Sequence, residues 1–273
     1  MAPLFAVSTY LYRQRRLTRD HLLEIAAHGF ASVELYASRF HVDYHNTAVV
    51  ADVQQWLTAA GLELASVHGP VFEQSLASAD AAERDAAVAE TERALHIARR
   101  IPFGTFVIHL GRPRADGTRG GTNRDAARRS IEALANIAQP LGVRIAVEVI
   151  PNDLSRPASL AHLIDEDIDA ANVGVCLDAG HARIDHPGGD VADAIETVSG
   201  HLMAIDIHDN RGRADDHLVP FDGGIDWPSA LTTVQKVGYD GAMTFELSTR
   251  GSTKDTLARA RAARGRISEL MQI

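Results

Sequence analysis

Cysteine is almost absent from this 273-residue chain, which has a single one, Cys176. One thiol cannot close an internal disulfide, and because Cys176 lies inside an apolar run we expect a packed core thiol rather than a nucleophile. Long apolar runs are missing too, since no stretch approaches the roughly 18 residues of a membrane span. The N-terminus also lacks a basic region followed by an apolar run. We therefore expect a cytoplasmic protein that is neither exported nor embedded.

Positive charge is in deficit, with 27 Lys and Arg against 36 Asp and Glu and a formal net charge of −9. Proteins that grip the backbone of nucleic acid usually present a basic surface, so a nucleic-acid partner is not expected. Hydrophobic residues make up 45% of the chain, which is ample for a buried core. No linker, low-complexity segment or change in composition marks a boundary, and we predict one domain over residues 1–273.

Short apolar runs alternate with longer segments of helical periodicity along the whole chain. The predicted strands are 4–8, 31–35, 62–67, 105–108, 144–147, 173–177, 202–207 and 242–245. The predicted helices are 18–29, 46–60, 78–100, 123–141, 157–165, 190–198, 226–237 and 253–271. This alternation predicts an α/β fold with a parallel sheet, and eight units predict a closed (β/α)8 TIM barrel. An open doubly wound sheet would need a glycine-rich phosphate turn after an early strand, and none is present.

Titratable residues lie in or directly after most of the predicted strands. They are Glu34, His68, His109, Glu148, Asp178, His208 and Glu246. The carboxyl ends of parallel barrel strands converge on one mouth, so we expect these side chains to share a cavity. A lone histidine at a strand end more often has a structural role, and Asp178 alone could equally cap a following helix with His181 in a turn. Recurrence on consecutive strands favours a common site.

Histidine and carboxylate ligands without companion cysteines suit a divalent cation such as Zn, Mn, Co or Mg. Several carboxylates in one cavity repel one another unless positive charge lies between them. The sequence therefore predicts a metal site at the barrel mouth.

The strand-end motifs also resemble a known family. They are Ser-Val-His68-Gly, Val-Ile-His109-Leu-Gly, Ala-Val-Glu148, Cys-Leu-Asp178-Ala-Gly-His181, Asp-Ile-His208-Asp-Asn, Asp215-Asp-His217-Leu-Val-Pro and Thr-Phe-Glu246-Leu. Together they resemble the xylose-isomerase-like barrel superfamily over nearly the whole chain. That superfamily includes sugar isomerases and epimerases, inosose dehydratases and endonuclease IV, and these motifs do not separate its members.

The resemblance implies two ligand sets. In the epimerases and isomerases, one divalent metal is held by the positions matching Glu148, Asp178, His208 and Glu246, and the two glutamates also transfer protons. In endonuclease IV, up to three zinc ions use those four positions and five more, which match His68, His109, His181, Asp215 and His217. This chain has a matching residue at all nine positions.

We favour a metal-dependent isomerase or epimerase of a sugar, sugar phosphate or polyol-derived ketone. In this hypothesis Glu148 and Glu246 exchange the substrate proton, and His181 stabilises the developing oxyanion. The expected substrate contacts are Glu34, His68, His109, Arg211, Arg213 and His217. An inosose-type dehydratase or lyase is a near neighbour. The alternatives are an endonuclease IV-like phosphodiesterase acting on abasic DNA and a non-catalytic barrel.

Three loops bear on the choice between a sugar-acting enzyme and a nuclease. The segment after His68 carries an acid and no base, and Phe72 is its sole candidate wedge for DNA. Phe221 stands where the resembled groups usually have a glycine. The basic loop at 111–124 could clamp a phosphate or carboxylate, or could simply be solvated, and its arginines are Arg112, Arg114, Arg119 and Arg124. The sequence does not identify the sugar, and it leaves a homo-oligomer open.

Overall fold

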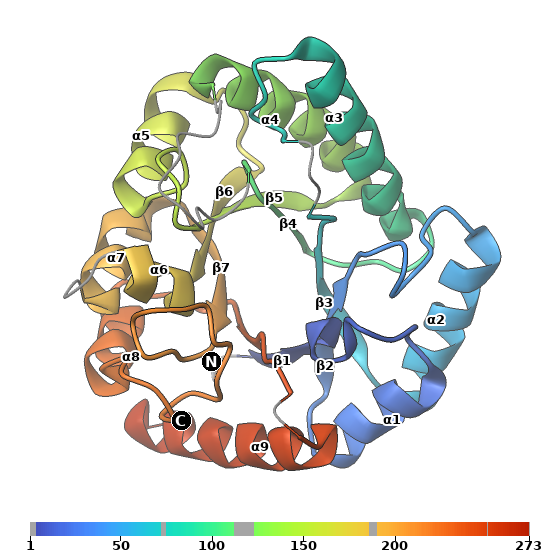
Figure 1. Cartoon of the computed structure of the whole chain (residues 1–273), viewed down its shortest axis with the longest axis vertical. Helices are drawn as coiled ribbons and strands as arrows, with labels where there is room; N and C mark the ends of the chain where they lie inside the picture. The colour runs from blue at the N-terminus through green and yellow to red at the C-terminus, as the bar shows by residue number, and fades with distance from the viewer. Residues whose placement is uncertain (1–3, 72–74, 112–122, 186–189, 250, 273) are drawn as a thin grey trace.

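A computed structural model describes residues 4–71, 75–111, 123–185, 190–249 and 251–272. Its strands close into a parallel barrel in chain order, with β8 hydrogen-bonded back to β1. The strands are β1 (Leu4–Ser8), β2 (Ser32–Tyr36), β3 (Glu63–His68), β4 (Thr105–Ile108), β5 (Arg144–Glu148), β6 (Val173–Asp178), β7 (Leu202–Ile207) and β8 (Ala242–Phe245). Helices surround this ring in Figure 1. The predicted eight-stranded (β/α)8 barrel is therefore confirmed.

The helices follow the predicted segments closely. They are α1 (Arg19–Ala27), α2 (Thr47–Ala60), α3 (Ala81–Leu95), α4 (Arg124–Ala138), α5 (Pro157–Asp167), α6 (Ala179–Asp185), α7 (Val191–Val198), α8 (Trp227–Lys236) and α9 (Thr253–Leu270). The predicted helix 78–100 was too long: Asp80 caps the start of α3 by accepting from the N–H groups of Ala82 and Glu83. The last residues of the predicted segment form a separate 3-10 helix, η2 (His96–Arg99). Helix α6 was not predicted.

Side chains alternate between the two sides of each strand, so the barrel has an inner and an outer core. The outer core packs the strands against the helices. Inside, Val107, Ala146 and Cys176 form a separate small cluster, against which Met203 and Ala204 pack. Cys176 is fully buried, as expected of a core thiol. Within the described residues, no helix is both long and apolar enough to cross a bilayer.

The loop between β7 and α8 is anchored by the buried carboxylate of Asp209. Its two oxygens accept hydrogen bonds from four backbone N–H groups and one indole N–H, those of Asn210, Phe221, Gly224, Ile225 and Trp227. Two residues of this loop, His217 and Phe221, have positive φ angles of 45° and 78°. Side chains with a Cβ disfavour that region, which explains why glycine is usual at the position of Phe221. Asp209 thus stabilises a strained loop.

Replacing Asp209 with asparagine is expected to lower the free energy of unfolding by about 3 kcal/mol. Whichever way the amide is oriented, its NH2 group faces at least two N–H donors that the carboxylate satisfied. Urea unfolding measures the change. The matched control is Asp222→Asn in the same loop, where the exposed pair with Arg259 should cost less than about 1 kcal/mol. Equal losses in both variants would contradict this account.

Candidate active site

The predicted residues meet at the carboxyl ends of the strands. Most are buried, with Glu148, Asp178 and His208 no more than 1% exposed. Among the predicted imidazoles and carboxylates, Asp215 is the least buried, with a side chain 36% exposed. Because β2 to β8 each deliver at least one such side chain, the mouth of the barrel holds a dense cluster of imidazoles and carboxylates.

Glu148 at the end of β5 bridges two histidines from β3 and β4. Its Oε2 lies 3.0 Å from His68 Nε2 and 2.6 Å from His109 Nε2. The other oxygen, Oε1, lies 3.0 Å from His181 Nδ1 but outside hydrogen-bond geometry. Glu148 is therefore in contact with residues from three different strand ends.

Asp178 both caps a helix and belongs to the cluster, which are the two roles that the sequence left open. Its Oδ1 accepts a hydrogen bond of 2.6 Å from the backbone N–H of His181, which starts α6 directly at the strand end. The same oxygen lies 3.0 Å from Nε2 of His208. Gly180 permits this approach, because a Cβ there would meet Cε1 of His208 at 1.9 Å. The cap of α6 is thus also part of the cluster.

Asp215 joins the β7–α8 loop to the cluster. Its Oδ2 lies 2.9 Å from Nε2 of His217 and 3.3 Å from Nε2 of His181. On the other side of its ring, Nδ1 of His217 is 2.9 Å from the backbone carbonyl of Glu246. The loop that Asp209 holds therefore delivers two members of the site.

These side chains fit a divalent cation. Among the described residues, three groups have donor atoms that all lie within 4.8 Å of one another, namely His68–His109–Glu148, Glu148–Asp178–His181 and His208–His217–Glu246. The predicted ligands Glu148, Asp178, His208 and Glu246 are spread over the last two groups, which the Asp178–His208 contact joins. Separations near 3 Å are those between neighbouring ligands of a metal bound at about 2.1 Å.

Buried atoms without partners support the same fit. Within the described residues, Oε1 of Glu148, Nδ1 of His181 and Nδ1 of His208 are buried and have no hydrogen-bond partner. Such atoms are rare in folded proteins unless a ligand or ion satisfies them. The residues present can hold a divalent metal, and neutral imidazole and ionised carboxylate are the forms that bind it.

Charge pairing dominates the titration of the cluster. Burial raises the pKa of Glu148, but the imidazoles of His109 and His181 outweigh burial and hold this pKa well below its usual range. Burial lowers the pKa of His217, but the Asp215 carboxylate reverses this and the pKa rises to about 9. Burial raises the pKa of Glu34 to about 7, against the lowering effect of His68. Glu34 therefore carries a proton part of the time near neutral pH.

Several residues of the site were not predicted. Asp206 points into the barrel from β7, where Cys176 Sγ donates to its Oδ2 over 3.1 Å. The sequence could have indicated Asp206, because a residue two positions before His208 on a strand points to the same side of the sheet as His208. Tyr10, directly after β1, packs its ring 4.7 Å from that of His217 and 5.1 Å from that of Tyr36. No local pattern marks Tyr10.

The arginines named from the sequence lie in different parts of the chain, and their contact with a substrate stays a prediction. Arg211 and Arg213 lie in the β7–α8 loop, where both are exposed and have no contact with the cluster within the described part of the chain. Arg124 pairs with Asp167 and donates to the carbonyl of His162, so it fastens α4 to α5. Arg112, Arg114, Arg119 and Phe72 lie outside the described residues.

The family model described as xylose isomerase-like TIM barrel matches residues 22–269. The chain belongs to this family. A D-psicose 3-epimerase of Agrobacterium fabrum is 27% identical over 233 residues, which are 83% of this chain and 78% of that protein. An uncharacterized protein of Methanocaldococcus jannaschii is 25% identical over 247 residues, 89% of this chain and 83% of that protein. The crystal structure of a D-tagatose 3-epimerase-like protein covers 98% of both chains with a TM-score of 0.83 and 23% identity.

The His217–Asp215 pair predicts a pH dependence for this xylose isomerase-like barrel after treatment with a chelator. The pKa of His217 in the folded protein, about 9, exceeds its unfolded value. Its proton therefore stabilises the fold fully below about pH 6.5, and this contribution of about 3 kcal/mol is lost as the pH rises through 9. Urea unfolding of the metal-free protein from pH 6 to pH 10 measures the loss.

His217→Gln should flatten this pH dependence, whereas His201→Gln, at a surface histidine paired with Asp165, should not. The pKa values of His68 and His181 are raised as well, because carboxylates outweigh their burial, so the comparison rests on the difference between variant and parent. An identical slope in His217→Gln and the parent protein would show that the pair does not hold the proton.

Proposed function

We propose that this protein is a divalent-metal-dependent epimerase of ketoses, which inverts a carbon next to a carbonyl by proton transfer. The observation that carries the proposal is the placement of two buried glutamates, Glu148 on β5 and Glu246 directly after β8. The relative from Agrobacterium fabrum, a D-psicose 3-epimerase, supports the same class of reaction. The predicted cytoplasmic location and a homo-oligomer stay predictions.

The barrel separates the two glutamates across its mouth. In a closed ring of eight strands in chain order, β5 stands opposite β1, and β8 is the neighbour of β1. Glu148 and Glu246 thus approach a substrate from different sides. A base on each face of a planar intermediate inverts the carbon, whereas a single base on one face returns the proton where it was removed. The geometry therefore favours epimerisation over same-face isomerisation.

The reaction balances with these two groups. One carboxylate removes the proton from the carbon next to the carbonyl, and the C–H electron pair moves towards the carbonyl oxygen to give an enediolate. The opposite carboxyl group donates a proton to the other face of that carbon, and the carbonyl reforms. A divalent cation, when bound by Glu148, Asp178, His208 and Glu246, polarises the carbonyl and the neighbouring hydroxyl. Exchange with water resets the two carboxyl groups.

Other residues of the cluster fit supporting roles in this proposal. The buried imidazole of His181 has a pKa that burial lowers but Asp178 and Asp215 raise well above its usual value. It can therefore donate a hydrogen bond to an oxygen that gains negative charge. Glu34, which accepts from Ser66 Oγ over 2.8 Å, has a second oxygen without a partner that can contact a substrate hydroxyl.

Substituting either glutamate tests the two-base mechanism. Glu246→Gln and Glu148→Gln should each lower the rate of epimerisation at least about 100-fold, because glutamine cannot accept the proton. The carboxylate that remains should still exchange the substrate proton for deuterium in D2O, with retention of configuration and from only one of the two epimers. Proton NMR of metal-loaded protein with a panel of ketoses measures inversion and exchange separately.

Glu132→Gln, at a half-buried glutamate that pairs with Arg128 on α4, is the matched control and should keep full activity. Metal content per chain, from elemental analysis, separates loss of the base from loss of the ion. Full turnover and full metal content in Glu246→Gln would refute the assignment.

The same preparation distinguishes the alternative classes. An epimerase should leave abasic duplex DNA intact, whereas an endonuclease IV-like phosphodiesterase should nick it at a rate that falls with salt, because phosphate contacts are screened. Loss of water from the substrate instead of inversion would indicate the dehydratase class. Efficient nicking without exchange into any ketose would overturn the proposed function.

A further inference from the structure

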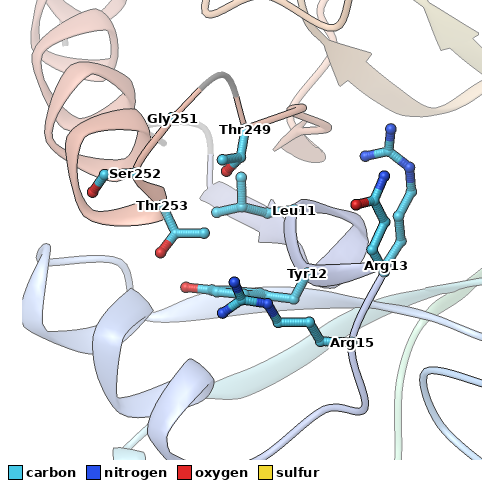
Figure 2. Close-up of a pocket in the computed structure, with 9 residues that line it drawn as sticks. Leu11, Tyr12, Arg13, Arg15, Thr249, Gly251, Ser252 and Thr253 are labelled. Carbon is cyan, nitrogen blue, oxygen red and sulfur yellow. The ribbon is translucent and has the colours of Figure 1, made fainter.

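A second cavity lies on the same face of the barrel, between the loop after β1 and the start of α9 (Figure 2). It has a volume of about 290 Å3. Most of its lining is polar: residues 11–15 contribute Arg13, Gln14 and Arg15 beside Leu11 and Tyr12, and residues 249 and 251–253 contribute Thr249, Ser252 and Thr253. Two chain segments from opposite ends of the sequence therefore form one basic pocket.

The guanidinium groups of Arg13 and Arg15 are not engaged in ion pairs within the described part of the chain. Other surface arginines of the barrel, such as Arg124, Arg128 and Arg259, are paired with carboxylates. Arg13 is half-buried, and its Cζ lies 4.0 Å from the ring centroid of Tyr10. In Figure 2, Arg15 extends in the direction of Thr253, while Arg13 points away from α9. Two unpaired positive charges beside one cavity favour an anionic ligand.

The facing wall offers hydrogen-bond donors. Ser252 caps α9, with its Oγ accepting from the N–H of Asp255. The N–H groups of Thr253 and Lys254, in the same turn, have no acceptor among the described residues, and the positive end of the helix dipole lies there. The hydroxyl of Thr249 is buried and has no partner within the described part of the chain.

The carboxylate of Glu24, which lies close to this wall, already has hydrogen-bond partners. Glu24 accepts from the hydroxyl of Tyr12 over 2.7 Å and from the hydroxyl of Thr253 over 3.0 Å. Its charge opposes an anion but is opposed in turn by Arg13 and Arg15. Among the described residues that line the pocket itself, the charged side chains are Arg13 and Arg15, and both are positive.

The pocket is connected to the metal-binding cluster. Arg13 packs on one side of Tyr10, and the Tyr10 ring lies 4.7 Å from that of His217. From β8, the chain passes Glu246 and reaches Thr249 three residues later. The pocket and the cluster are therefore neighbours on the same face of the barrel.

We propose that this pocket binds the phosphate group of a phosphorylated ketose whose carbonyl end is turned over at the metal-binding cluster. The inference rests on the proposed epimerase function and adds the substrate class. A phosphate has three terminal oxygens and nearly two negative charges at neutral pH, which match two guanidiniums together with the N–H and hydroxyl donors opposite. The hydroxyl terminus of an unphosphorylated ketose would leave both guanidiniums without a counter-charge.

The test compares ketopentose 5-phosphates and ketohexose 6-phosphates with the same free ketoses in the metal-loaded enzyme. The double variant Arg13→Gln/Arg15→Gln should raise KM for the phosphorylated substrate about 10- to 100-fold, the range expected for lost charge-assisted hydrogen bonds. Its kcat at saturation and its KM for the free ketose should change little. Arg16→Gln is the matched control, because Arg16 is exposed on the same segment but does not line the pocket.

A second measurement does not depend on turnover. Inorganic phosphate should raise the melting temperature of the chelator-treated protein and of Arg16→Gln, but not that of the double variant. A KM for the phosphorylated ketose that is unchanged in the double variant would overturn the pocket assignment. So would a preference for a ketose carboxylic acid over the phosphate. In both of these cases the enzyme should still exchange deuterium into free ketoses. Failure of the pocket assignment would therefore leave the proposed epimerase function intact.

Discussion

The pairing of buried carboxylates with imidazoles is the interaction on which this site depends. Glu148 and Asp178 are almost completely removed from water, and an isolated carboxylate in that position would be costly. Each contacts at least two histidines, which supply positive charge as protons or give it up to a bound cation. The ends of β2 to β8 serve this balance, because each contributes either a negative group or a group that can neutralise one.

The barrel makes this balance geometrically possible. Parallel strands in a closed ring deliver their carboxyl ends to one place, so residues distant in sequence contact one another without any long loop. The exception is the β7–α8 loop, where Asp209 holds the backbone against the strain of two positive φ angles. That loop completes the site with Asp215 and His217, and the stability of the loop is therefore tied to the chemistry.

The basic pocket locally offsets the acidic composition of the chain. A net charge of −9 repels a phosphorylated substrate at long range. Arg13 and Arg15, which have no carboxylate partner in the described part of the chain, provide a local attraction that opposes this repulsion. A sugar phosphate held at both ends would lose little further freedom in reaching the transition state, since binding energy at the remote phosphate can orient the reacting carbons.

The sequence by itself determined the architecture and most of the cluster. Apolar runs of four to six residues ending in Glu, Asp or His marked the strands and their reactive ends, and Asn46 and Gly61 bounded α2 where expected. Such features are local, because a strand or a cap depends on residues close along the chain. The helix α6 was missed because its cap, Asp178, also belongs to a strand.

Tertiary structure alone decided which side chains share a contact. Nothing local shows that Asp215 lies between His181 and His217, that Asp206 is buried beside Cys176, or that Tyr10 packs on His217. The pocket of Arg13 and Arg15 joins residues near the start of the chain to the cap of the last helix. Closure of the barrel brings β1 beside β8. No periodicity or spacing along the sequence indicates such a contact between the two ends of a chain.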